Sequence, residues 1–141
     1  MKMYQLSADS IGKLKGVHPD LVKVVMLAIQ KSDIDFKVGE GVRTLARQKT
    51  LVASGKSKTL NSRHIPGKDG FGKAVDLWTM PNGTVTWVQA DYVKLSKHVL
   101  AAAKELGVAI RWGGDWDGDS NWREEKFFDG PHFELLTAKY P

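Results

Sequence analysis

Residues 91–112, DYVKLSKHVLAAAKELGVAIRW, carry the pattern that decides the fold. Apolar side chains recur along residues 91–106 at the spacing of an amphipathic helix, and Gly107 is typical of a helix end. Residues 108–112 then form a short apolar run that predicts a strand. A long helix followed at once by a short strand indicates a domain in which helices pack on a small sheet.

The rest of the chain repeats this alternation of helix and strand. Helical spacing follows Pro19, which suits the first turn of a helix, and a further helix is expected from Thr44 to about Ser54. Strands are predicted at residues 36–42, 74–78 and 132–136. We therefore expect an α+β fold, with one small domain over residues 1–141 and a central antiparallel sheet flanked by helices.

The composition limits the kind of metal site and the compartment. The chain has 141 residues, no cysteine and a formal net charge of +5. Without cysteine, any zinc must bind His, Asp or Glu. No signal-peptide segment is visible, and the most apolar stretch, residues 21–29, is too short to span a bilayer. We expect synthesis in the cytoplasm and no stable membrane insertion.

Three segments place a histidine or a carboxylate where a predicted loop meets a predicted strand. They are Ser62-Arg63-His64, Gly72-Lys73-Ala74-Val75-Asp76 and Asp129-Gly130-Pro131-His132. Two neutral imidazoles and one carboxylate would hold a catalytic zinc and leave one position for water. A further carboxylate is then needed to manage protons. Spacing alone is weak evidence, because single His and Asp residues in loops usually lie on the surface.

Taken together and in this order, these segments resemble the Ser-x-His, Gly-x-Ala-x-Asp and Asp/Glu-x-x-His motifs of the M15 zinc peptidases. Residues 41–44 (GVRT) and 111–116 (RWGGDW) resemble the branch that contains the L-alanyl-D-glutamate peptidases of phage endolysins. The similarity extends from about Leu21 to Leu136, and the order of five motifs makes it specific. It implies the small α+β fold that D-alanyl-D-alanine carboxypeptidases share with the zinc-bearing domain of Hedgehog proteins.

The resemblance also implies a metal site. His64, Asp76 and His132 match the zinc ligands of the family, and Asp129 matches its general base. His64 and Asp76 stand twelve positions apart, farther than in the family, and the added glycine-rich residues suit a loop insertion. Asp69 lies in that insertion and competes with Asp76. We favour Asp76 because it lies in an apolar strand, where an unpaired carboxylate would be costly.

The same resemblance implies substrate-binding residues. Arg43 matches the arginine that binds the substrate or stabilises the oxyanion, although a simple pairing with Glu40 or an aspartate is the alternative. Ser62 matches a position near the first ligand. Tryptophans near the motifs either line the substrate groove or pack in the core, and the one we assign to the groove is Trp112; the others are Trp116 and Trp122.

An acidic loop suggests a second metal. Asp115, Asp117 and Asp119 alternate as oxygen ligands do in calcium loops. The segment lacks the glutamate of an EF-hand, because Lys126 stands at that position. Calcium binding and a solvated acidic loop are therefore the two interpretations.

The sequence thus predicts a zinc metallopeptidase of the endolysin type that hydrolyses peptidoglycan stem peptides, at the L-alanyl-D-glutamate bond, for lysis of a bacterial host. The alternatives are a D-alanyl-D-alanine carboxypeptidase and a non-catalytic zinc-binding module, which would not need Asp129. Nucleic-acid binding is disfavoured, because no groove-reading helix or aromatic–basic motif stands out. We expect a monomer without a separate cell-wall-binding domain. It would be made in the host cytoplasm and would reach the cell wall or periplasm with the help of a holin-type protein.

Overall fold

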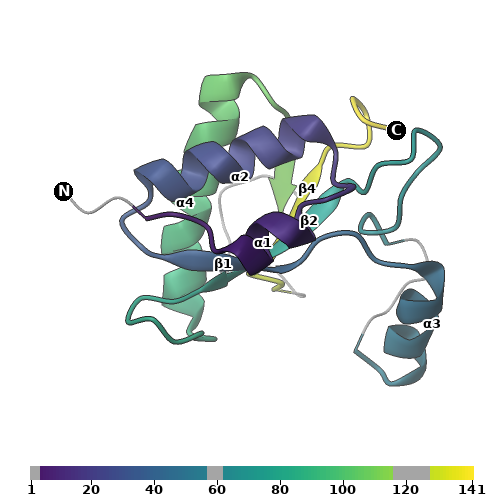
Figure 1. The fold of residues 1–141 in the computed structure, drawn as a ribbon, viewed down its shortest axis with the longest axis horizontal. Coiled ribbons are helices and arrows are strands. Elements are labelled where there is room, and N and C mark those ends of the chain that lie inside the picture. The colour runs from purple at the N-terminus through teal and green to yellow at the C-terminus, as the bar shows by residue number, and fades with distance from the viewer. Residues whose placement is uncertain (1–3, 57–61, 116–127) are drawn as a thin grey trace.

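A four-stranded antiparallel sheet forms the centre of the molecule (Figure 1). The computed structural model describes residues 4–56, 62–115 and 128–141. The strand order across the sheet is β1-β2-β4-β3, and each neighbouring pair is antiparallel. The strands are β1 (Phe36–Glu40), β2 (Ala74–Thr79), β3 (Ile110–Trp112) and β4 (His132–Leu135). The helices are α1 (Ala8–Lys13), α2 (Pro19–Lys31), α3 (Leu45–Ala53) and α4 (Gln89–Leu106).

The core lies between the sheet and the two longest helices. Helices α2 and α4 pack against each other, and α4 also contacts β2 and β3. Successive side chains of a strand point to opposite faces of a sheet. Val75 and Leu77 of β2 and Phe133 and Leu135 of β4 are fully buried in the core cluster. Helix α3 stands to one side, away from α2 and α4 (Figure 1).

The alternate residues of the same strands form the other face, which we call the polar face. Asp76 and Trp78 alternate with the core residues of β2, and His132 and Glu134 do so in β4. The register places Asp76 opposite both Glu40 and His132. The face continues with Arg111, which pairs with Glu134 in the register of β3 and β4. Charged side chains are therefore concentrated on one side of the sheet.

The predicted α+β fold is confirmed, with small shifts at the element ends. Thr44 caps α3, because its hydroxyl accepts a hydrogen bond from the Arg47 N–H. Gly107 ends α4 in the left-handed conformation, with φ of 70°. The strand predicted at residues 108–112 begins only at Ile110, because the Val108 N–H still bonds to the Ala103 carbonyl at the helix end.

Helix α1 was not predicted from the sequence. It closes the outer edge of the sheet, where the buried Ser10 hydroxyl accepts a hydrogen bond of 3.0 Å from the Val38 N–H of β1. An edge strand needs such a cover, because its unpaired N–H groups otherwise invite another strand. Within the described ranges, no helix has both the length and the apolar character needed to cross a membrane.

Candidate metal centre

His64, Asp76 and His132 converge at the middle of the polar face. Asp76 and His132 are opposite each other in the β2–β4 register. His64 arrives from the loop before β2, and its carbonyl accepts a hydrogen bond of 2.9 Å from the Arg43 N–H. Each of the three offers one ligand atom, and these atoms all lie within 4.8 Å of one another. The three predicted metal-binding residues are thus brought together.

The distances from Asp76 to both histidines fit a tetrahedral metal ion. The Asp76 Oδ1 atom lies 3.3 Å from His64 Nε2 and 3.4 Å from His132 Nδ1. Tetrahedral bonds of roughly 2.0–2.2 Å, as zinc forms with nitrogen and oxygen, separate the ligand atoms by roughly 3.3–3.6 Å. Asp76 Oδ1 is buried, and no hydrogen-bond partner is found for it within the described residues. A buried oxygen of this kind calls for a cation.

Each histidine directs toward this position the ring nitrogen that is not bonded to Gly41 or Glu134. His64 Nδ1 lies 2.8 Å from the Gly41 carbonyl, which can only accept, so Nδ1 carries the proton and Nε2 is a lone-pair donor. His132 Nε2 lies 2.8 Å from a carboxylate oxygen of Glu134, which leaves Nδ1 for the metal position. Metal-bound histidines typically donate their other N–H to a carbonyl or carboxylate in this way.

The charges of the group favour a cation. Burial alone would raise the pKa of Asp76, but His64 and His132 hold it below its ordinary value. Burial alone would lower the pKa of His132, but its contacts with Asp76 and Glu134 raise it to about 9. Without a metal, His132 therefore keeps a second proton, on Nδ1, at neutral pH. A metal ion would release that proton, because it supplies the positive charge that the carboxylates attract.

Arg43 is fixed beside the metal centre. It is buried, and its Nε and one terminal nitrogen donate to the two oxygens of Glu40, each at 2.8 Å. Its other terminal nitrogen donates to the Gln48 side chain at 2.8 Å. Arg43 also lies 3.6 Å from the second oxygen of Asp76. The guanidinium therefore pairs with Glu40, as the alternative interpretation had it, and still places positive charge next to Asp76.

Asp129 lies close enough to the three convergent residues for their charges to affect its pKa, but it is not one of them. It lies in the turn before β4, where its N–H donates to Gly113 and its carbonyl accepts from the His132 N–H. Burial raises the pKa of the Asp129 carboxyl, and the charge of Asp76 raises it further. His64, His132 and Arg43 act in the opposite direction. A carboxylate with a raised pKa beside a metal centre suits proton transfer.

Asp69 lies outside the metal centre. Its carboxylate accepts a hydrogen bond from Lys73 at 2.7 Å and one from the Phe71 N–H at 3.0 Å. The inserted loop thus uses Asp69 to fix its own shape. Asp76 is the carboxylate that the structure brings to the two histidines.

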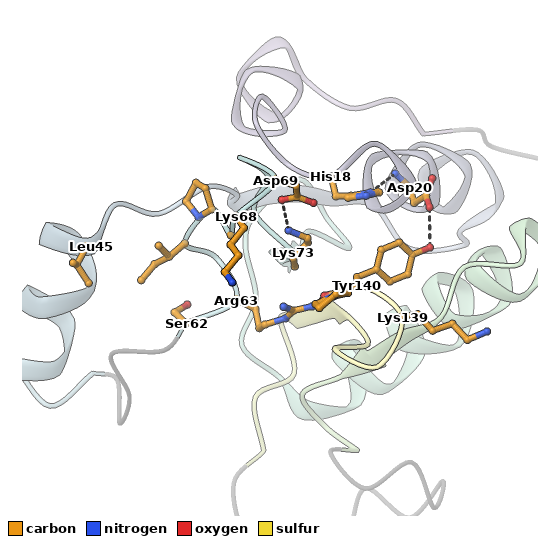
Figure 2. Close-up of a pocket in the computed structure, with 14 residues that line it drawn as sticks. His18, Asp20, Leu45, Ser62, Arg63, Lys68, Asp69, Lys73, Lys139 and Tyr140 are labelled. Carbon is orange, nitrogen blue, oxygen red and sulfur yellow. Dashed lines mark hydrogen bonds and ion pairs between the residues drawn. The ribbon is translucent and has the colours of Figure 1, made fainter.

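Ser62 contacts His64 and also borders a separate pocket. Its hydroxyl accepts a hydrogen bond of 3.2 Å from the His64 N–H. The pocket in Figure 2 lies beyond it, between Ser62 and Tyr140, and basic side chains such as Lys68 and Lys139 line it. In the same figure, Tyr140 bonds to Asp20. Of the described residues that line this pocket, none is one of the three convergent residues.

Trp112 lies in the core, which is the other of its two interpretations. Only 4% of its surface is exposed. Its indole N–H donates to the Gly130 carbonyl at 2.7 Å, and its ring packs against Phe128 and Phe133. Assigning Trp112 to the substrate groove from the sequence was therefore wrong. The residue supports the turn that carries Asp129 and His132.

Several predictions fall outside the described residues. Trp116, Trp122, Asp117 and Asp119 belong to residues 116–127, so the structure does not describe a calcium site there. Asp115 is described and partly buried. Calcium binding by the acidic loop remains a prediction from the sequence.

The sequence reasoning missed Glu134 and Gln48. Glu134 is buried, accepts the His132 N–H and pairs with Arg111 at 2.9 Å. Burial alone would raise the pKa of Glu134, but His132 and Arg111 lower it, so the carboxylate stays charged. Its position two residues after His132 could have identified it, because strand residues two apart share a face.

Fold and site together define a class of protein. A His-Asp-His donor set on one face of a small sheet, with a further carboxylate and a buried arginine beside it, is the arrangement of a mononuclear metallohydrolase. The chain matches the family model of the phage L-alanyl-D-glutamate peptidases over residues 2–136. It belongs to that family.

Individual relatives agree with this assignment. The L-alanyl-D-glutamate peptidase of Escherichia phage T5 is 31% identical over 140 residues, which cover 94% of this chain and 98% of that protein. The L-alanyl-D-glutamate peptidase of Listeria phage A118 is 30% identical, over 97% of this chain and 43% of that protein. Among solved structures, the Serratia marcescens L-Ala D-Glu endopeptidase ChiX matches with a TM-score of 0.81 and 41% identity. The match covers 97% of this chain and 94% of that one.

Proposed function

We propose that this protein is a zinc-dependent endopeptidase that hydrolyses the L-alanyl-D-glutamate bond of peptidoglycan stem peptides. The observation that carries the proposal is the convergence of His64 Nε2, Asp76 Oδ1 and His132 Nδ1, with Asp76 at the spacing of a tetrahedral zinc ligand from both histidines. Membership of the L-alanyl-D-glutamate peptidase family indicates which bond is cleaved. Zinc-loaded protein should therefore release peptide from purified peptidoglycan and leave new D-glutamate amino groups.

In this proposal the three ligands hold the zinc and the neighbouring residues handle charge and protons. When bound, zinc lowers the pKa of a coordinated water and polarises the scissile carbonyl. Asp129 takes the proton of the attacking water and later delivers it to the leaving amino group of D-glutamate. Arg43 stabilises the negative charge that develops on the carbonyl oxygen, because Glu40 and Gln48 hold its guanidinium in place. Ser62 contributes by fixing the backbone of His64.

Glu134 is proposed to orient His132 for the metal. Glu134→Ala should weaken zinc binding by roughly 10- to 100-fold, the usual effect of losing an outer partner of a metal-bound histidine. Glu134→Gln should weaken it less, because the amide oxygen still accepts the His132 N–H. Competition with a chromophoric chelator measures both affinities. Glu105→Gln is the control, since it removes a carboxylate from an exposed pair with Lys31. Unchanged zinc affinity in Glu134→Ala would show that His132 needs no such support.

The setting of the reaction follows from the same proposal. The substrate lies in the bacterial cell wall or periplasm, whereas the protein would be made in the host cytoplasm. A holin-type protein would therefore have to permeabilise the membrane that separates the two. The net charge of +5 would add a weak, salt-sensitive attraction to an anionic envelope. Action as a monomer is part of this proposal.

A further inference from the structure

An aromatic pair lies at the end of β2 that follows Asp76, and one of its members, Trp78, belongs to the polar face. Trp78 follows Asp76 by two residues in β2, and Leu77 between them is fully buried. The side chains of Asp76 and Trp78 therefore leave the same face of the sheet, at Cα positions roughly 6–7 Å apart. Trp87 contacts Trp78 edge-to-face, with ring centroids 5.5 Å apart. We call Trp78 and Trp87 the indole pair.

Trp87 is held in place although most of it faces solvent. Its exposed fraction is 65%. Its ring lies almost parallel to that of Tyr92, at 12° and 6.1 Å, and Tyr92 is buried. The Tyr92 hydroxyl donates to the Thr86 carbonyl at 2.7 Å, and the Thr86 N–H donates to Thr79 at 2.9 Å. An exposed indole with a fixed orientation contributes little to folding but is typical of a binding surface.

Trp78, which Trp87 contacts, is also held in one orientation. A side chain at Gly39 would overlap the Trp78 ring, so the glycine lets the indole lie against the backbone of β1. The ammonium groups of Lys13 and Lys37 lie 6.0 and 5.8 Å from the centre of this ring. Lys13 also pairs with Asp9 at the surface. The surface thus combines apolar ring faces with hydrogen-bond donors.

This combination fits a sugar residue. A pyranose ring offers a C–H face that packs on an indole, and its hydroxyl and acetamido oxygens accept hydrogen bonds from ammonium groups. In peptidoglycan, the amino group of the stem L-alanine is acylated by the lactyl group of N-acetylmuramic acid. One residue and the lactyl group therefore separate the scissile carbonyl from the sugar, a reach of about 7 Å in extended form. A substrate of this reach would extend from the metal centre toward Trp78, whose Cα lies roughly 6–7 Å from that of Asp76.

We infer that the indole pair is a glycan subsite, which binds the N-acetylmuramic acid that carries the scissile stem peptide. The inference rests on the proposed cleavage of the L-alanyl-D-glutamate bond. It assigns the sugar to the side of the metal centre occupied by Trp78 and Lys37, opposite the side occupied by Glu134. The enzyme then prefers stem peptides attached to the glycan over free peptides.

The test compares two substrates that differ only in the sugar. One is a free stem peptide, and the other is the same peptide acylated by N-acetylmuramic acid. In zinc-loaded protein, Trp87→Ala should lower kcat/KM for the muramyl peptide by roughly 5- to 30-fold and leave the free peptide unchanged. Because Trp87 is mostly exposed, the variant should keep its fold, which thermal unfolding can verify. Leu106→Ala removes an exposed side chain about 25 Å away along α4 and serves as control.

The outcomes separate the subsite from the proposed function. A loss confined to the muramyl peptide supports the glycan subsite. If wild type cleaves both substrates and Trp87→Ala changes neither rate, or lowers both equally, the indole pair is no sugar site. If wild type cleaves neither substrate, the proposed function fails and the subsite falls with it.

Discussion

His132→Ala should leave the purified protein with little zinc and with little activity. Two ligands hold zinc poorly, and catalytic sites typically need three from the protein. His64→Ala should have the same effect, because His64 Nε2 and His132 Nδ1 contact the same oxygen of Asp76. Metal analysis after gel filtration measures zinc per chain, and peptide hydrolysis measures activity.

His98→Ala is the matched control for these variants. His98 lies on α4 and pairs with Asp33 at the surface, so its loss should change neither zinc content nor activity. Full zinc occupancy in both His64→Ala and His132→Ala would remove these residues from the ligand set.

Asp129→Asn should lower turnover by roughly 10²- to 10⁴-fold, the usual contribution of a general base. Asparagine is nearly isosteric with aspartate but cannot accept the proton. Zinc content should stay near wild type, because the three ligands remain. Asp69→Asn is the control, since Asp69 pairs with Lys73 away from the metal centre. Steady-state kinetics and metal analysis on the same preparations separate the two roles.

The pH dependence offers an independent check on Asp129. Burial and the charge of Asp76 raise the pKa of Asp129, so the carboxyl takes up its proton at a higher pH than an ordinary aspartate. Only the ionised form accepts a proton, and activity should therefore fall as the pH drops through this raised pKa. Full activity in Asp129→Asn would make another carboxylate the base. Loss of zinc would make Asp129 a ligand.

The fold was largely predictable because its two main helices carry a clear apolar period. Residues 91–106 and the stretch after Pro19 bury one side against the sheet, which is the feature that periodicity detects. Helix α1 has six residues and buries only Ser10, so it leaves no apolar period to detect. Strand β1 ends at Glu40, before the predicted end, after an irregularity in its register between Val38 and Glu40.

The site was predictable only through the family resemblance. Asp76 and His132 are 56 positions apart, and only the pairing of β2 with β4 makes them neighbours. No local pattern specifies that register. Trp112 was wrongly assigned to the groove, because an aromatic residue near a motif can pack in the core as well as line a groove. The indole pair escaped notice because Trp87 lies outside every motif.

The most direct test of the account is mass spectrometry of the fragments that zinc-loaded protein releases from purified peptidoglycan. The account predicts stem peptides with a new amino-terminal D-glutamate, and glycan strands that retain the lactyl-linked L-alanine. Asp129→Asn with full zinc should release far less. Loss of terminal D-alanine from stems that stay attached to the glycan would contradict the account and make the protein a carboxypeptidase.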